Sequence, residues 1–152
     1  MLIILINLSA CQNFTFSQED LRKLKSTKIC PKCNLQKTNL YKLDLSNANL
    51  SKANLTNSNL SDTVLWDADL KGAILIDADL SNANLQYSDL RKANLKGSDL
   101  SQADLSGATL TDVNLDNVVL CHTNMPDGKR NYSNCSGANL YNANLARTNL
   151  YN

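Results

Sequence analysis

The sequence contains few of the residues on which compact domains and helical bundles usually depend. It has one glutamate, Glu19, beside thirteen aspartates, and only two phenylalanines, five tyrosines and one tryptophan. With so few aromatic residues, the core must be built from small and medium aliphatic side chains. The near absence of glutamate disfavours a bundle of long surface helices. The longest apolar run, at the N-terminus, is too short for a transmembrane helix.

Charge is unevenly distributed along a chain whose length, 152 residues, suits one domain. Residues 17–42 hold seven Lys or Arg against Glu19 and Asp20, whereas residues 43–152 hold eight against twelve. A basic collar, residues 17–42, therefore precedes a mildly acidic body, and the formal net charge is +1.

Leucine repeats with a period of five. It occupies every residue number divisible by five from Leu35 to Leu120, eighteen in succession, and returns at Leu140, Leu145 and Leu150. On an α-helix, leucines five apart would be rotated by about 140° and would scatter around the circumference. On a strand, an odd period sends alternate leucines to opposite faces. The leucines share one core only if the chain turns a corner in each repeat.

The other repeat positions agree with this interpretation. Two residues before each leucine the side chain is small, with Leu43 as the exception. The residue just before leucine is Asn or Asp in nineteen of twenty-four repeats, which suits the local hydrogen bonding of a corner. The two residues after leucine are mixed, as solvent-facing positions should be.

Three units show the repeat in its most regular form: Ser46-Asn47-Ala48-Asn49-Leu50, Ser81-Asn82-Ala83-Asn84-Leu85 and Ser101-Gln102-Ala103-Asp104-Leu105. They resemble the A(D/N)LXX motif of the pentapeptide-repeat family. The resemblance implies an all-β fold, a right-handed quadrilateral parallel β-helix with four repeats in each square coil. Twenty-four repeats would make about six coils and a rod of about 29 Å. The lead-in Cys30 to Leu35 resembles the start of secreted cyanobacterial members.

We expect three segments: an apolar leader at 1–10, a linker and capping helix at 11–29, and the β-helix at 30–152. An irregular loop is expected at about 121–137, where the leucine register lapses and Pro126-Asp127-Gly128 favours a turn.

The capping helix is expected to begin near Ser17 and to end before Pro31. Ser17 is a good N-cap, and Phe16 and Leu21 have the spacing of a hydrophobic staple. Leu21 and Leu24 share one face, which would cover the open first coil.

The leader, Met1 to Ala10, is mainly aliphatic and uncharged, like the apolar part of a secretion signal. It ends in Leu8-Ser9-Ala10-Cys11, which resembles the lipobox of bacterial lipoproteins and implies lipidation of Cys11. No basic residue precedes the apolar run, in contrast to usual signals. The alternative is an apolar tail in which Cys11 has no role.

Four further cysteines are candidate sites. Cys30 and Cys33 form a CxxC, interpreted as a disulfide or buried thiols, with a redox pair and half a zinc site as alternatives. Cys121 and Cys135 bracket the irregular loop and are a second candidate disulfide, suited to an oxidising compartment. A cysteine nucleophile assisted by His122 is disfavoured, because His122 falls on an outward position without an enclosing pocket.

Trp66 and Tyr87 are the candidate partner contact. They are twenty-one residues apart, which places them nearly above one another on successive coils. Incidental surface aromatics are the alternative. The pairs Val64/Trp66 and Ile74/Ile76 are ten residues apart, so they are expected on opposite sides of the rod.

These features predict a non-enzymatic exported scaffold or protein-interaction protein without metal or cofactor. The expected location is the periplasm or thylakoid lumen, with lipid anchoring to a membrane as one possibility. The rival hypothesis is a DNA mimic that binds topoisomerases, which would require a strongly acidic rod. Nucleic acid itself is not an expected ligand. An end-to-end homodimer through the C-terminal coil is a further prediction.

Overall fold

The computed structural model describes residues 17–131. The apolar leader 1–10, Cys11, Phe16, Cys135 and the C-terminal coil expected to mediate dimerisation all lie outside the described residues. Predictions that rest on them stay predictions.

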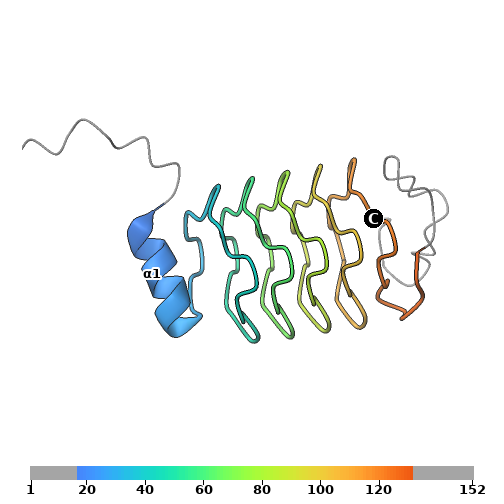
Figure 1. Ribbon diagram of the computed structural model, residues 1–152, viewed down its shortest axis with the longest axis horizontal. Helices are drawn as coiled ribbons and strands as arrows, with labels where there is room; N and C mark the ends of the chain where they lie inside the picture. The colour runs from blue at the N-terminus through green and yellow to red at the C-terminus, as the bar shows by residue number, and fades with distance from the viewer. Residues whose placement is uncertain (1–16, 132–152) are drawn as a thin grey trace, which may run out of the picture.

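One helix, α1 (Gln18–Thr27), lies across one end of a rod of stacked coils (Figure 1). The Ser17 side chain caps it by accepting a hydrogen bond from the backbone N–H of Asp20, at 3.1 Å. Leu24 is fully buried and packs into the same core as the leucines of the rod. The helix stops at Lys28, which adopts a left-handed conformation. Among residues 17–131 no helix is long and apolar enough to cross a membrane.

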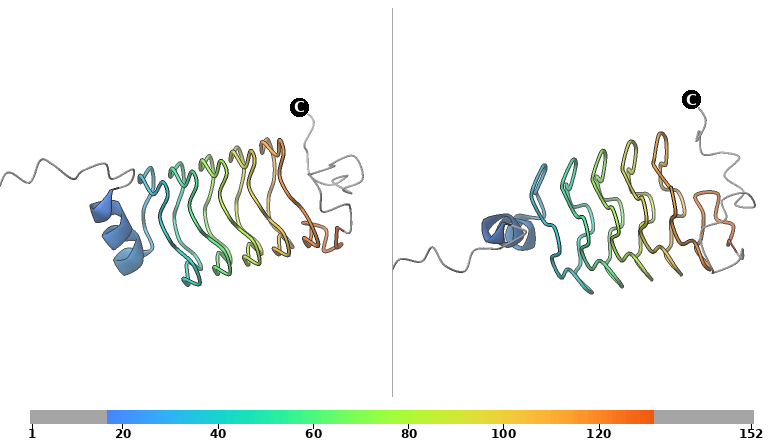
Figure 2. Two further views of the ribbon diagram at one scale, coloured as in Figure 1. Left: turned by 45° about the horizontal axis from the view of Figure 1, so that its top comes forward. Right: turned by 90° about the horizontal axis from the view of Figure 1, so that it is seen from above.

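The rod is a stack of twenty-residue coils. Parallel β-bridges join residues twenty apart, from Ile29 with Asn49 to Asp104 with Asn124. Each coil therefore takes four pentapeptides, and counterparts twenty residues apart lie side by side on neighbouring coils (Figure 2). The bridges are isolated because each side of a coil is extended over very few residues before the next corner.

Each corner lies at the two residues that follow a leucine. The second of them has a positive φ, between 53° and 62° at the non-glycine corners, and the glycines Gly72, Gly97 and Gly107 stand at the same position. The leucine carbonyl accepts a hydrogen bond from the third residue onward, as from Ala48 N to Leu45 O at 3.0 Å. Both observations are features of a type II turn.

The Asn or Asp before each leucine satisfies the one backbone donor that the coils leave over. In the repeat around Leu55, the N–H groups of Leu55, Asn57 and Asn59 bond to neighbouring coils, and that of Ser58 closes the turn. The remaining N–H, of Thr56, donates to the side-chain oxygen of Asn54 at 3.1 Å. All five donors of the repeat are thereby paired, as burial of a backbone requires.

A few described repeats depart from this rule. Ile29 replaces the Asn or Asp where the residue two positions later is Pro31, which has no N–H to satisfy. Val64 and Ile74 also replace it, and there Trp66 and Ile76 stand two positions later. At these two repeats an apolar pair takes the place of a hydrogen-bonded polar pair.

The core contains two inward columns. The leucines at every fifth position from Leu35 to Leu110 are at most 2% exposed, and hydroxyl residues of the small column are buried with them. The buried hydroxyl of Thr63 donates to the carbonyl of Leu60 at 2.6 Å, and those of Ser88 and Ser98 make the same bond in their repeats. These bonds offset the cost of burying the hydroxyls.

The repeat geometry persists beyond the last leucine of the unbroken run. Met125 takes the place of a leucine and is 2% exposed, and Asn124 still bridges to Asp104. The chain departs at Pro126: Asn124 forms an antiparallel bridge with Arg130, and Met125 N bonds to Lys129 O at 2.8 Å. Within the described residues the irregular segment is thus a tight hairpin that starts five residues later than the expected boundary near 121.

Four corners and four sides describe the surface. Corner A holds residues 31–32 and their counterparts at steps of twenty; corners B, C and D begin likewise at 36–37, 41–42 and 46–47. Side AB carries the column Asn34, Asn54, Ile74, Asn94 and Asn114, and side CD carries Asp44, Val64, Asn84, Asp104 and Asn124. Sides AB and CD are two corners apart, so they face in opposite directions.

Candidate functional site

Trp66 and Tyr87 contact each other on corner D, on neighbouring coils. Their ring centroids are 6.3 Å apart and the ring planes meet at 77°, an edge-to-face arrangement. The two residues are nevertheless 40% and 60% exposed. The separation of twenty-one residues therefore brings two aromatic rings together on the surface while leaving much of each accessible.

Gly107 provides the space for the tyrosine ring. It is the counterpart of Tyr87 on the next coil, and a Cβ at this position would stand 2.6 Å from Cδ1 of Tyr87. The ring consequently lies over a residue without a side chain. The position of Gly107, twenty residues after Tyr87 and therefore one coil further along, is the signal in the sequence for this contact.

Other large hydrophobic residues are exposed on the same part of the rod as the aromatic pair. Six large hydrophobic residues in the described part of the chain are markedly exposed: Ile29, Tyr41, Val64, Trp66, Ile74 and Tyr87. Four of them lie on side CD or on the corners that border it. We call Tyr41, Val64, Trp66 and Tyr87 the CD patch. Val64 lies on side CD of the coil that contains Trp66, and Tyr41 lies at corner C, one coil nearer to α1.

Beyond the CD patch, a shallow cleft of about 210 Å³ lies between α1 and the first coil. Leu24, Lys25, Lys28, Leu43, Asp44 and Leu45 line it. Leu43 stands where other repeats have a small residue. The larger side chain fits there because the neighbour of this coil on one side is α1, which lies farther from it than another coil would.

A charged pair closes one edge of this cleft. Lys28 Nζ lies 3.2 Å from Asp44 Oδ1 and also donates to the carbonyl of Ser46 at 3.3 Å. The hydroxyl and backbone N–H of Ser46 and the Lys28 ammonium lower the pKa of Asp44 to about 2. Asp44 and Lys28 thus form an exposed ion pair between the end of α1 and the rod.

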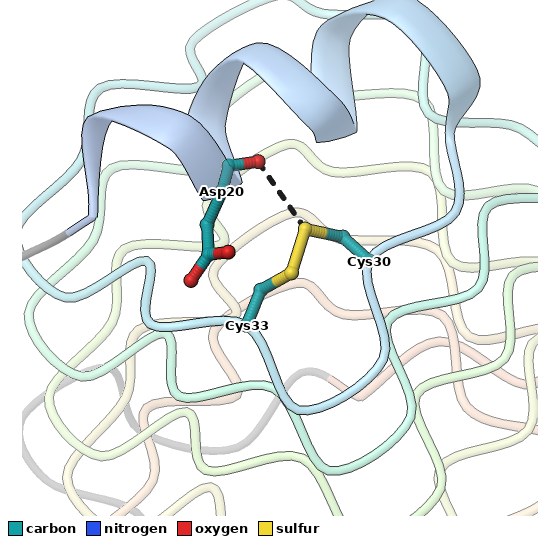
Figure 3. A group of neighbouring side chains, drawn as sticks. All are labelled: Asp20, Cys30 and Cys33. Atoms are coloured by element: carbon teal, nitrogen blue, oxygen red, sulfur yellow. Dashed lines mark hydrogen bonds between the residues drawn. A yellow bond between two sulfur atoms is a disulfide. The ribbon is translucent and has the colours of Figure 1, made fainter.

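Cys30 and Cys33 are joined by a disulfide at the junction of α1 and the first coil (Figure 3). Cys30 Sγ lies 3.2 Å from the carbonyl oxygen of Asp20, and Asp20 Oδ2 accepts the N–H of Asn34 at 2.8 Å. Potential ligand atoms of Asp20, Cys30 and Cys33 lie within 4.8 Å of one another. While the two sulfurs are bonded to each other, however, they cannot act as thiolate ligands of a metal.

Cys121 and His122 follow Leu120 at corner C. Cys121 Sγ and His122 Nδ1 are 3.8 Å apart, and His122 is exposed on the outward position expected for it. Cys121 and His122 each make a further interaction. The pairing of Cys121 with Cys135 stays a prediction, and the exposed imidazole offers no enclosed site for nucleophilic catalysis.

The geometry defines the class of the protein as a parallel β-solenoid with a leucine core and a twenty-residue coil. The family model for pentapeptide repeats matches the sequence of this chain with eight copies, over residues 32–67, 67–102, 98–127 and 131–152. The chain belongs to the pentapeptide-repeat family, whose members form right-handed quadrilateral β-helices. No curated protein matches the sequence significantly.

Solved structures similar to this chain are also pentapeptide-repeat proteins. One from the Arabidopsis thaliana thylakoid lumen is 28% identical, with a TM-score of 0.43 over 52% of this chain and 66% of its own. HetL from the cyanobacterium Nostoc sp., involved in heterocyst differentiation regulation, is 28% identical, with a TM-score of 0.35 over 68% of this chain and 60% of its own. Rfr23 from the cyanobacterium Cyanothece is 28% identical, with a TM-score of 0.34 over 71% of this chain and 95% of its own. This chain therefore spans less than two thirds of the length of the first two.

Proposed function

We propose that this protein is a non-enzymatic exported scaffold that binds a protein partner through the CD patch. The observation that carries the proposal is the edge-to-face pair of Trp66 and Tyr87, which stays substantially exposed at the surface of a rigid rod. Tryptophan and tyrosine are enriched among the residues that dominate binding energy at protein interfaces.

The backbone rule of the repeats supports the same surface. Val64 replaces an Asn or Asp whose side chain would accept the N–H of residue 66, so the corner loses a hydrogen bond for the sake of two exposed apolar side chains. Departures from local structural rules without a stabilising return are expected at functional sites. The CD patch therefore has the character of a surface selected for contact.

The filled interior supports a function without catalysis. Throughout the described rod, leucine and small side chains occupy the axis, and the cleft beside α1 is shallow and open. Catalytic and cofactor sites usually require an enclosed pocket with converging polar groups.

The charge balance supports a scaffold over a DNA mimic. Residues 29–110 hold nine aspartates and eight Lys or Arg, so the rod lacks the strong excess of carboxylates that a duplex-like surface needs.

Photo-crosslinking from the CD patch tests the proposal. A photoreactive phenylalanine analogue replaces Tyr87 in one variant and Asn57, on corner B, in a matched control, and both are expressed in the native host. We expect one dominant crosslinked protein from position 87, absent from position 57 and abolished by Trp66→Ser. Identical product patterns from both positions would exclude the CD patch as the binding surface.

We also propose that the fold continues to about six coils, that Cys11 is lipidated and that the protein acts in the periplasm or thylakoid lumen. The basic collar supports a location at a membrane, because Lys and Arg near an anionic bilayer each add about 1 kcal/mol of attraction. Membrane partition of the wild type against Cys11→Ser, with mass spectrometry of the mature N-terminus, tests these points together. A Cys11 found unmodified in the mature protein rules out lipidation.

A further inference from the structure

The net charge of +1 hides a lateral separation of charge around the rod. Over residues 29–110, corners A and B and the side between them hold seven basic residues and one acid, Asp77, a net of six positive charges. The basic residues are Lys32, Lys52, Lys71, Arg91 and Lys92 on corner A and Lys37 and Lys96 on corner B. The rest of the surface over the same residues holds one base, Lys42, against eight aspartates.

Six of the seven basic residues are available for an external ligand. All seven are exposed, and among residues 17–131 only Arg91 of the seven forms a salt bridge, to Asp89. The column of side AB between the two corners carries asparagines and Ile74 but no carboxylate. We call this surface the AB face.

The basic residues of corner A, which we call the corner A row, are expected to lower the stability of the fold when no ligand is bound. The row contains two pairs of direct counterparts, Lys32 with Lys52 and Lys71 with Arg91, each on neighbouring coils whose backbones are about 4.8 Å apart. Gly72 stands between Lys52 and Lys92. Like charges on neighbouring strands are destabilising, and this spacing is within one Debye length at physiological salt, about 8 Å. The chain places Asn, Asp, Gly and Ser at other corners, so lysine is not needed for the turn itself.

The centre of the AB face is apolar. Ile74 lies between Asn54 and Asn94 on the neighbouring coils and is 36% exposed, and half-buried Ile76 follows it at corner B. As at Val64 and Trp66, an apolar pair here replaces the Asn or Asp that caps a corner. The face ends at the next coil, where Asp112 and Asp116 occupy corners A and B.

We propose that the AB face binds the surface of an anionic phospholipid bilayer. The column of side AB is built from β-bridges between residues twenty apart, so the basic corners flank one row of residues along the rod. Its flanking lysines complement acidic headgroups, and Ile74 is placed to contact the apolar edge of the headgroup region. This binding depends neither on the CD patch nor on lipidation of Cys11.

A nucleic acid is a poorer match to the same charges. Proteins that bind single strands stack bases on aromatic side chains, whereas the AB face has none among the described residues. Duplex grooves admit a helix or a β-ribbon, and the AB face presents neither.

Vesicle sedimentation of the full chain tests the proposal, with Cys11→Ser in every variant to exclude acyl anchoring. The vesicles contain equal parts of phosphatidylcholine and phosphatidylglycerol, or phosphatidylcholine alone. The test variant carries Lys52→Asn, Lys71→Ser and Lys92→Asn, residues that the chain itself uses at equivalent corner positions. The control removes the same charge from the CD side by Lys25→Gln, Lys42→Asn and Lys129→Gln.

We expect salt-sensitive binding of the parent and the control to the anionic vesicles only. Each lysine near the surface is worth roughly five-fold in the partition coefficient, so the test variant should bind about 100-fold more weakly. Its urea denaturation midpoint should be unchanged or higher, because repulsion in the row is relieved. Equal binding of the two variants would overturn the proposal, as would salt-sensitive binding to a DNA duplex without binding to the vesicles.

Discussion

Truncation of one central leucine measures how rigidly the coils hold the core. Leu75 is fully buried, with Leu55 and Leu95 as its counterparts on the two neighbouring coils. Leu75→Ala removes three carbons, about 2.4 kcal/mol of transfer free energy at about 0.8 kcal/mol per carbon. Because hydrogen bonds clamp the coil on both sides, the cavity cannot close, and we expect a total loss of about 3–5 kcal/mol.

Urea unfolding followed by circular dichroism provides the measurement, with the dependence on denaturant, the m-value, compared between the proteins. Ile74→Asn is the matched control, because Asn stands at the equivalent position of both neighbouring coils. It should cost less than about 1 kcal/mol, since Ile74 is partly exposed. A loss below about 1.5 kcal/mol for Leu75→Ala with an unchanged m-value would refute a closely packed leucine column.

Three further predictions concern the small column, the aromatic pair and pH. Thr63→Val should lower the unfolding free energy by about 1 kcal/mol, because the hydroxyl bond to the Leu60 carbonyl is lost while the shape of the side chain is kept. Chemical denaturation measures this, and an unchanged free energy of unfolding would mean that the hydroxyl bond contributes nothing. Gly107→Ala should lower the free energy of unfolding by about 1–2 kcal/mol and displace the ring of Tyr87. A shift in the fluorescence emission of the single tryptophan, Trp66, would report the displacement, and an unchanged spectrum would contradict the contact. The pKa of Asp44 is lowered on folding to about 2, so the stabilising effect of its ionised carboxylate is complete above the unfolded pKa near 4 and is lost as pH falls to about 2. Titration of the carboxyl groups by NMR, with Asp44→Asn as the reference, measures this pKa. An ordinary pKa for Asp44 would contradict the prediction.

The period of the leucines contained most of the fold. A repeat of five excludes a single helix face or strand face, so a corner in every repeat followed directly from sequence. The hydrogen bonding expected of the Asn and Asp side chains at each corner is confirmed, whereas the position of the positive φ was not specified. Each of these side chains accepts the N–H of the residue two positions later, while residues as different as Lys42, Tyr87 and His122 adopt the positive φ. Regular neighbours impose that conformation, whatever the local preference of the side chain.

Features of the surface could be predicted only by comparing residues about twenty positions apart, which is the length of one coil. The separation of Trp66 and Tyr87 was read in this way, and the structure places the two rings in contact. Charge was counted along the chain instead, which revealed the basic collar but not the AB face. The same arithmetic applied to Lys32, Lys52 and Lys92 would have revealed the row.

Because every pentapeptide contains a corner, the core repeats every five residues, whereas each face of the surface repeats only every twenty. We call these two periods the two frames of the rod. Loss or gain of one pentapeptide leaves every leucine inward and every corner closed, yet it rotates all that follows by a quarter turn. A five-residue deletion between Trp66 and Tyr87 would separate the two rings and break the lysine row without opening the core. Only insertions or deletions of whole coils preserve both frames. Natural length variation in units of five can therefore exchange the surfaces of such a rod while its stability is retained.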